Sequence, residues 1–376
     1  MADNSKPIIP VSLDDFLQDT AAGSAASAIG NNFFGINHRQ TPAAIPLNKD
    51  NYGLTFFVRP QLNMQKDNLR NLRLMTPLLS NDQTSYQRII RCLLDPRIMA
   101  GYPIPVEGNG DAAYQRELCP FVDNQNAFFP ILTNHLKSIS GWPDIRSTDF
   151  TSKEGAYRET HTMVDGISVD YSAYNMDATF RSSRGDPITS LFFYWRHYMS
   201  AVFEGTLLPY PDMIVENEID YQTRIYRLVL DSEKRYVQKI AATGIAFPTN
   251  VPIGGSFDYS TEKPFNNIDA DITINFACNG VMYQDDILIK EFNSTVAIFN
   301  PLMSDTPDDR TNFVSTSSSP ISRSMIQIDR SHLSLFNNRG YPYINPNTYE
   351  LGWYINKLDY NTKLNALQNF QNLIKG

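Results

Sequence analysis

Residues 246–280, AFPTNVPIGGSFDYSTEKPFNNIDADITINFACNG, decide the fold of this chain. In DITINF, residues 271–276, apolar and polar residues alternate, and this period of two predicts a β-strand with one face in a core and the other in water. The pair Asn279-Gly280 favours a type I′ turn. We therefore expect the following residues, VMYQDDILIKEF, to return as the second strand of a hairpin.

A long helix is predicted upstream, in DPITSLFFYWRHYMSAVFEG (186–205). Asp186 suits the N-cap, Pro187 suits the first turn and Gly205 suits the C-terminal end. One apolar stripe recurs at steps of three and four residues, so the helix must pack against other parts of the chain. The expected core anchors on this stripe are Ile188, Leu191, Trp195 and Met199.

Other segments add strands and short helices. TRIYRLVLD (223–231) and RYVQKIAATGIAF (235–247) predict two strands joined by a turn, and residues 52–58 predict another strand. A helix is expected before Pro96 with Asp82 as its N-cap, and a short amphipathic helix over residues 361–375. Together these elements predict a β-rich α+β protein.

Composition excludes several classes of function. Charged residues make up 19% of the chain, below the roughly 25% of an average soluble protein. The net charge of −8 leaves no basic face for nucleic-acid phosphates. The three cysteines lack metal-ligand spacing, and we expect them to be buried thiols in a reducing compartment. The first thirty residues do not have the pattern of a signal peptide, and no apolar run is long enough to predict a membrane span.

Only one group of residues has the composition of a catalytic or metal site. Glu159, His161 and Asp165 lie in RETHTMVDG, and a hydrolase could use such a trio. The β-branched residues around them favour extended structure, which directs alternate side chains to opposite sides. The IGG run at 253–255 lacks the helix and lysine of a phosphate loop and is interpreted as a bend. We therefore expect no catalytic residue, no metal site and no cofactor.

The stretch from 159 to 280, about a third of the chain, resembles the tail tube proteins of contractile-tailed bacteriophages. That family has a phrase of the kind aFPtnv, then lDy, then an alternating strand, and the matching residues here are 246–251, 257–259 and 272–276. The resemblance implies an antiparallel β-sandwich of two sheets with one flanking helix, and with extensions at both ends.

The resemblance also implies a structural virion protein of a contractile phage tail, and not an enzyme. Copies are expected to form homohexameric rings that stack into the tail tube, or into a ring continuous with it at the baseplate or neck. Expected partners are sheath, baseplate or neck proteins, together with the tape measure protein and double-stranded DNA in the lumen, without specific binding. Such a protein would be assembled in the host cytoplasm and found in the virion, with no membrane partner.

Function in such a ring would lie in strand edges and in an acidic wall. Negative charge repels DNA over about 10 Å at ordinary ionic strength, so a genome can pass without adhering. Edge strands that would otherwise promote aggregation become contacts when they pair with the next subunit. The residues expected at or near subunit contacts are Phe247, Pro248, Asn250, Arg224, Tyr226 and Tyr236.

Composition along the chain and the resemblance together divide the chain into four regions. Residues 1–30 are expected to be a flexible arm, 31–150 a strand, helix and loop region, 151–300 the tube-like sandwich, and 301–376 an irregular extension ending in a short helix. The alternative hypothesis is a β-sandwich virion protein that binds carbohydrate or a receptor, because 20 tyrosines and three tryptophans could offer stacking surfaces.

Overall fold

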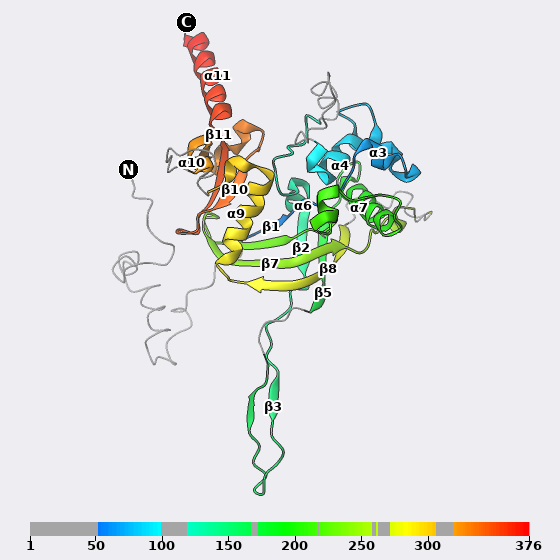
Figure 1. Cartoon of the computed structure of the whole chain (residues 1–376). Coiled ribbons are helices and arrows are strands. Elements are labelled where there is room, and N and C mark those ends of the chain that lie inside the picture. The colour runs from blue at the N-terminus through cyan, green and yellow to red at the C-terminus, as the bar shows by residue number, and fades with distance from the viewer. Residues whose placement is uncertain are drawn as a thin grey trace, which may run out of the picture.

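A six-stranded antiparallel sheet forms the centre of the molecule (Figure 1). The computed structural model describes residues 52–98, 119–166, 172–216, 218–257, 261, 271–305 and 319–375, so the predicted N-terminal arm lies outside the described residues. The strand order is β1-β6-β7-β8-β5-β2. The strands are β1 (Tyr52–Phe57), β2 (Leu136–Ser140), β5 (Ala173–Arg181), β6 (Ile225–Leu230), β7 (Val237–Pro248) and β8 (Asp271–Tyr283).

The sheet curves so far that a short helix links its two edges. Phe129 N donates to Phe57 O of β1 at 2.9 Å, and the chain then forms α6 (Pro130–His135) and enters β2 at the opposite edge. The β-rich α+β class with antiparallel sheets is therefore confirmed, and the sheet is nearly closed. The two-sheet sandwich is not confirmed.

The predicted turn at Asn279-Gly280 is wrong, because β8 continues through both residues to Tyr283. Gly280 lies opposite Gly244 of β7, between the paired residues Thr243↔Val281 and Ile245↔Asn279. Gly280 has φ of 67°, and a Cβ on Gly244 would lie 2.7 Å from a backbone oxygen of β8. Two opposed glycines thus bend a continuous pair of strands, as glycine does where backbones approach closely.

The residues after β8 form a second large helix instead of the predicted hairpin strand. This helix is α9 (Ile287–Phe299), and it buries Leu288, Ile289, Phe292 and Val296. These positions recur at steps of three and four, so the helical period outweighs the local turn preference. The expectation of a single flanking helix is therefore wrong as well.

Two hydrophobic cores lie on either side of the glycine bend. The first core joins α7 (Pro187–Phe203) to β5 and to residues 272–278 of β8. The second joins α9 to β6 and to Ile240 and Ala242 of β7. Gly244 and Gly280 separate these two sets in both long strands, so the bend allows one sheet to support two cores.

The ends of the two predicted helices differ in detail from expectation. Asp186 is in the left-handed region, with φ of 47°, and its side chain makes no cap hydrogen bond; its carbonyl accepts from Tyr86 Oη at 3.0 Å. Helix α4 (Tyr86–Leu94) is capped by Ser85, whose Oγ accepts from Arg88 N at 3.3 Å, and not by Asp82. The Asp82 carboxylate instead accepts a hydrogen bond from Thr84 N at 2.9 Å.

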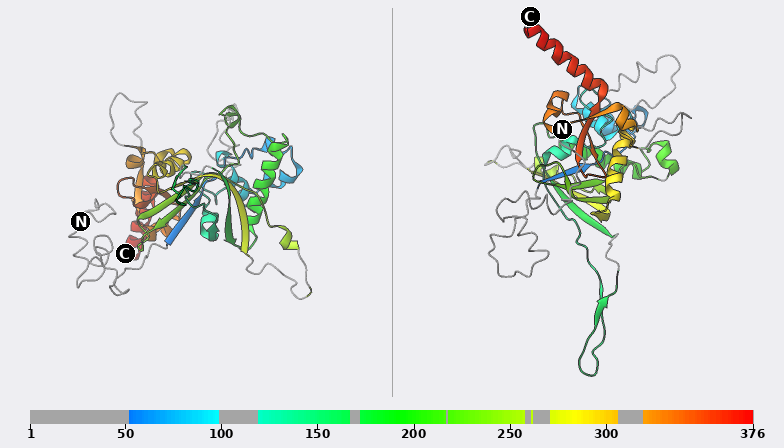
Figure 2. Two further views of the ribbon diagram at one scale, coloured as in Figure 1. Left: turned by 90° about the horizontal axis from the view of Figure 1, so that it is seen from below. Right: turned by 90° about the vertical axis from the view of Figure 1, so that its left-hand side faces the viewer.

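The described C-terminal residues, 319–375, contain a three-stranded sheet where the sequence predicted irregular structure before the final helix. Strands β9 (Met325–Ile328), β10 (Tyr341–Ile344) and β11 (Leu351–Asn356) form an antiparallel sheet in the order β10-β11-β9. Asn293 of α9 fixes this sheet to the second core, since its amide donates to Ile344 O at 2.7 Å and accepts from Ile344 N at 2.9 Å. Helix α11 (Lys357–Lys375) then projects from the body (Figures 1 and 2).

The remaining elements are short and lie mainly in connections. They are α3 (Lys66–Leu69), η2 (Arg73–Leu79), η3 (Pro96–Ile98), β3 (Asp149–Thr151), β4 (Thr162–Val164), α8 (Pro211–Glu216), η4 (Gly254–Phe257), η5 (Pro301–Met303), α10 (Pro320–Ser324) and η6 (Arg330–Phe336).

Candidate functional site

The most prominent surface feature is a long hairpin that leaves the body on the side away from α11 (Figures 1 and 2). We call residues 145–166 the projecting hairpin. Its paired strands β3 and β4 are exposed on every residue. Several large apolar side chains lie in water along it, including Phe150, which is 52% exposed, and Tyr157, which is 94% exposed. Apolar side chains gathered on such an extended element mark an interaction site.

Hydrogen bonds hold the projecting hairpin in shape without support from the body. Ser152 N donates to His161 O at 2.8 Å, and His161 N donates to Ser152 Oγ at 2.9 Å. At the tip, Gly155 N donates to Glu159 O at 2.9 Å, and Tyr157 N donates to Glu159 Oε2 at 2.8 Å. The tip is therefore preformed, which lowers the entropy cost of docking.

The trio Glu159, His161 and Asp165 lies on this projecting hairpin and forms no catalytic geometry. All three residues are exposed, and Glu159 is engaged in closing the turn. Across the residues that the structure describes, no cluster of three His, Cys, Asp or Glu side chains could hold a metal ion. The thiols of Cys92 and Cys278 are buried, and desolvation raises the pKa of each to about 12, so neither is an activated nucleophile.

The six residues predicted for subunit contacts lie on two neighbouring parts of the sheet. Phe247 and Pro248 end β7, where the Phe247 ring packs against Tyr221 at a centroid distance of 6.3 Å. Asn250 binds β8, since its Oδ1 accepts from Asn275 N at 2.6 Å. These contacts fix the 247–250 segment in position within the chain.

Arg224, Tyr226 and Tyr236 belong to the second part, at β6 and the turn after it. The Arg224 guanidinium pairs with Glu291 of α9 at 2.6 Å and lies over the Tyr226 ring, 5.2 Å from its centroid. Tyr226 is 0% exposed, so it has no surface that a second chain could contact directly. Tyr236 is half-buried and bridges to Glu350.

The four predicted helix anchors all lie in the first core. Ile188, Leu191, Trp195 and Met199 are buried on α7. The Trp195 ring stacks on Phe192 at 5.8 Å and donates its Nε1 hydrogen to a backbone carbonyl at 3.0 Å.

The buried guanidinium of Arg59, which the sequence did not reveal, ties residues between β1 and β2 to the sheet. Arg59 follows β1 and donates to four backbone carbonyls, those of Cys92, Leu93, Asp123 and Asn126, at 2.6–2.9 Å. Desolvation lowers the pKa of Arg59 to about 10, so the guanidinium remains charged at neutral pH. The C-terminal end of α4 and the segment 123–126 are thus fastened to the end of β1.

A buried carboxylate lies next to this region. Tyr198 Oη donates to Asp220 Oδ2 and accepts from Asn63 N at 3.1 Å. Burial raises the pKa of Asp220 to about 6, although the Tyr198 hydrogen bond and the charge of Arg97 lower it. Asp220 therefore titrates within the range in which proteins are commonly handled.

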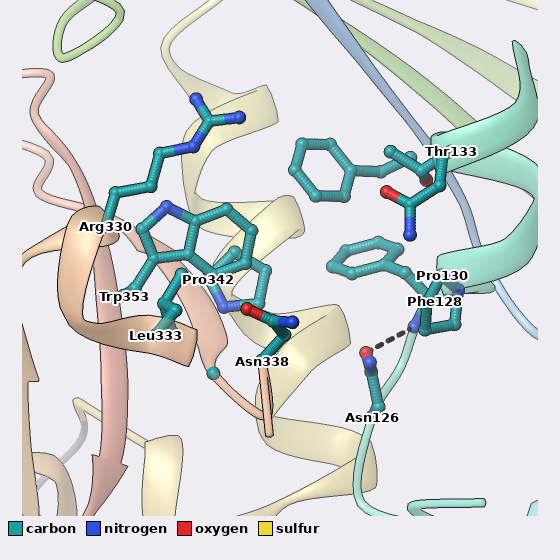
Figure 3. Close-up of a pocket in the computed structure, with 12 residues that line it drawn as sticks. Asn126, Phe128, Pro130, Thr133, Arg330, Leu333, Asn338, Pro342 and Trp353 are labelled. Carbon is teal, nitrogen blue, oxygen red and sulfur yellow. Dashed lines mark hydrogen bonds between the residues drawn. The ribbon is translucent and has the colours of Figure 1, made fainter. Parts of the chain in front are cut away.

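A pocket of about 360 Å³ lies between the sheet and the C-terminal region, and we call it the aromatic pocket (Figure 3). Trp353, Leu333 and Pro342 lie on one side of it, while Phe128, Pro130 and Thr133 lie on the other. Its other lining residues are Phe56, Asn126, Asn134, Arg330, Asn338 and Gly340. The lining combines an apolar interior with amide groups and contains no carboxylate.

The described residues thus combine a curved antiparallel sheet with an exposed projecting hairpin. A family model described as putative phage tail tube protein matches residues 11–370, so the chain belongs to this family of tail tube proteins. The predicted resemblance is confirmed. The family is structural, and the chain is accordingly a structural tail protein and not an enzyme.

Solved structures with partial likeness come from contractile injection systems. The tube-terminating cap of the anti-feeding prophage is 17% identical, with a TM-score of 0.27, over 42% of this chain and 82% of that chain. The sheath-tube complex of an extracellular contractile injection system, PVC, gives the same identity and coverages with a TM-score of 0.25. The sheath/tube terminator of that system is 13% identical, with a TM-score of 0.23, over 42% of this chain and 87% of that chain. No curated protein matches this chain.

The sequence predicts no membrane span, and the helices of the structure can be compared with that prediction. Among the described residues, no helix combines the length and the apolar character that a bilayer crossing requires.

Proposed function

We propose that copies of this chain assemble into hexameric rings that stack into a tail tube, or into a ring continuous with the tube at the baseplate or neck. Membership of the tail tube family carries this proposal. The projecting hairpin supports it, because a preformed apolar arm outside the body has its use in contact with another chain.

The contacts within a ring would involve the sheet and the segments around it. Phe247 and Pro248 end β7, and Asn250 follows it beside β8, while Arg224 and Tyr236 immediately precede β6 and β7. We propose these five residues at or near the contact between neighbouring subunits, with the buried Pro248 near it and not in it. Tyr226 would act from inside the chain by supporting the Arg224 guanidinium.

The lumen of such a ring would carry DNA without binding it. The chain has a net charge of −8, and a wall built from several copies multiplies that charge. We propose that the tape measure protein and DNA occupy the lumen, that sheath, baseplate or neck proteins contact the outside, and that assembly takes place in the host cytoplasm before incorporation into the virion.

Electron microscopy of the purified full-length chain tests the ring proposal. We expect rings with six-fold symmetry and an open centre, and short stacks of them at higher protein concentration. Particles of a single chain at every concentration would contradict it.

The carbohydrate-binding alternative receives no comparable support. It required exposed aromatic platforms, yet many of the large aromatic side chains, such as Trp195, Tyr198, Tyr226 and Phe292, are fully buried. Specific binding of this chain on a glycan array would revive the carbohydrate-binding alternative.

A further inference from the structure

We propose that helix α11 of one copy docks on the α7–α8 face of the neighbouring copy in the same ring. The α7–α8 face is the exposed part of residues 203–219, which run from the end of α7 through α8. This inference rests on the proposed assembly and assigns a second copy of the chain as the occupant of this face.

The α7–α8 face holds large apolar side chains in water. Its exposed apolar residues are Phe203, Leu208, Ile214, Val215 and Ile219. The segment beneath them is fixed to the body, because the backbone of Leu208 accepts from and donates to the Asn68 side chain at 2.9 and 3.1 Å. Tyr210 is buried and donates from its Oη to Asp95 Oδ2 at 2.7 Å. Apolar side chains exposed on a fixed segment mark an interaction site.

The α7–α8 face is also acidic. Residues 203–219 contain four acidic residues and no lysine or arginine. The exposed carboxylates are those of Glu204, Glu216 and Glu218. Asp212 pairs with Arg97 at 2.6 Å, and residues 66–70, which contact Leu208 through Asn68, add a net charge of +1. The surroundings therefore remain negative, and an occupant of this face should combine apolar side chains with positive charge.

Helix α11 has this chemistry. Its 19 residues carry three lysines and one aspartate, a net charge of +2. Residues 361–366 are exposed at every position, and they include Lys363 and Leu364. Apolar residues recur along the helix at Tyr360, Leu364, Leu367, Phe370 and Ile374. Steps of three and four place these positions on one face, as in helices that dock by an apolar stripe.

The base of α11 is held by the body, so the helix is presented in one direction. The Tyr360 ring stacks on Phe336 at a centroid distance of 6.0 Å. Lys357 Nζ donates to Ser322 O and Arg323 O, each at 2.8 Å. A helix of 19 residues is about 28 Å long, so most of α11 extends beyond these contacts. Its fixed base lowers the entropy cost of docking.

The positions of the two surfaces favour contact between copies. Helix α7 lies on one side of the molecule, and β11, from which α11 continues, lies on the other (Figures 1 and 2). Each copy thus offers α11 on one side and the α7–α8 face on the other. A contact between different surfaces of identical chains forms a ring when the rotation between neighbours closes. The pairing of α11 with the α7–α8 face is therefore assigned to neighbours within a ring.

Chemical cross-linking tests the contact in full-length protein at a concentration at which rings form. The three natural cysteines are buried, so exposed cysteines can be introduced by Leu364→Cys on α11 and Val215→Cys on α8. With a short bismaleimide, we expect the double variant to give a ladder of linked chains that ends at six. An equal mixture of the two single variants should give a two-chain product and nothing larger, because each chain then carries one exposed cysteine.

The matched control pairs Leu364→Cys with Ile298→Cys, an exposed apolar position on α9. We expect at least tenfold less product between chains for this pair. Equal yields for both pairs, in protein that still forms rings by electron microscopy, would overturn the α11 contact and leave the proposed function intact. A ladder that continues beyond six chains would overturn its placement within a ring. Failure of the wild-type chain to assemble would overturn both the contact and the proposed function.

A charge exchange provides a measurement without cysteine chemistry. Lys363→Glu and Glu216→Lys each place like charges on the two surfaces, whereas the double variant restores opposite charges. We expect each single variant to raise the protein concentration needed for rings at least fivefold, and the double variant to return within twofold of wild type. Unchanged thresholds in both single variants would contradict the inference. Weaker assembly in both, without rescue in the double variant, would contradict it as well.

Discussion

Trp195 shows how a single side chain organises the first core. It stacks on Phe192, contacts the Phe129 ring at 5.9 Å and donates a hydrogen bond to Tyr221 O. One residue thus joins α7, the start of α6 and the segment before β6. The stripe on α7 indicated that Trp195 would be buried, whereas its carbonyl partner follows only from the structure.

Replacing Trp195 by alanine should cost about 3–5 kcal/mol of unfolding free energy, because a cavity replaces a large aromatic ring. Phe203→Ala on the same helix is the matched control, since Phe203 is 94% exposed and should change stability by less than about 0.5 kcal/mol. Urea denaturation followed by circular dichroism measures both. Equal losses for the two variants would contradict the assignment of the first core.

Asp220 provides a prediction about pH. Its folded pKa of about 6 lies above the unfolded value near 3.9, so the folded state holds the proton more tightly. The stability gained from this proton is present below pH 4 and is lost as the pH rises through about 6. Asp220→Asn should therefore match the wild type near pH 4 and exceed it by up to about 3 kcal/mol above pH 7, since an amide oxygen can still accept from Tyr198.

The control for this prediction is Asp67→Asn, because the Asp67 side chain is largely exposed, with Arg70 as its ion-pair neighbour. Denaturation midpoints at pH 4.5 and pH 7.5 should separate Asp220→Asn from wild type much more at the higher pH than at the lower one. An Asp220→Asn chain less stable than wild type at pH 7.5 would show that the ionised carboxylate is favourable.

At the scale of elements, the glycine bend in β7 and β8 explains how one sheet supports two cores. Gly244→Ala would place a methyl group 2.7 Å from Asn279 O, a backbone atom with little freedom to move. We expect a loss of about 1–3 kcal/mol. Gly254→Ala, where a Cβ meets nothing within 4 Å, should be neutral. Thermal unfolding compares them, and a neutral Gly244→Ala would argue against a required bend.

Sequence patterns predicted the long elements well and the short or bent ones poorly. The stripe on α7 and the alternation in β6, β7 and β8 are strong because each repeats over several residues. The Asn279-Gly280 pair misled because turn preference is local, whereas Gly280 lies within β8, between the paired positions Asn279↔Ile245 and Val281↔Thr243. The C-terminal strands contain Pro342 or Gly352, which obscure a strand pattern in so few residues.

The candidate surfaces depend on tertiary structure, which local patterns do not report. Alternating Thr and Val residues indicated extended structure at 160–164, but not that the strand would leave the body. The aromatic pocket brings Phe56, Phe128 and Trp353 together from distant parts of the chain. Arg59 was missed for the same reason, since its partners are backbone carbonyls and carry no side-chain signature.

At the scale of the whole molecule, the hairpin is an appendage and the body is self-sufficient. The described residues of the hairpin contribute no residue to any hydrophobic core. Replacing residues 147–164 by a short Gly-Ser linker should therefore leave the unfolding temperature within a few degrees of wild type and abolish stacking. Calorimetry and electron microscopy measure the two effects, and a chain that unfolds without the hairpin would contradict this division.

The central claim is that identical chains complete one another as rings that stack head-to-tail. Cryo-electron microscopy of the full-length chain at rising concentration tests it most directly. The account predicts six-fold rings around an open channel, in stacks of rings. Isolated chains, or closed back-to-back dimers with the hairpins in water, would contradict it.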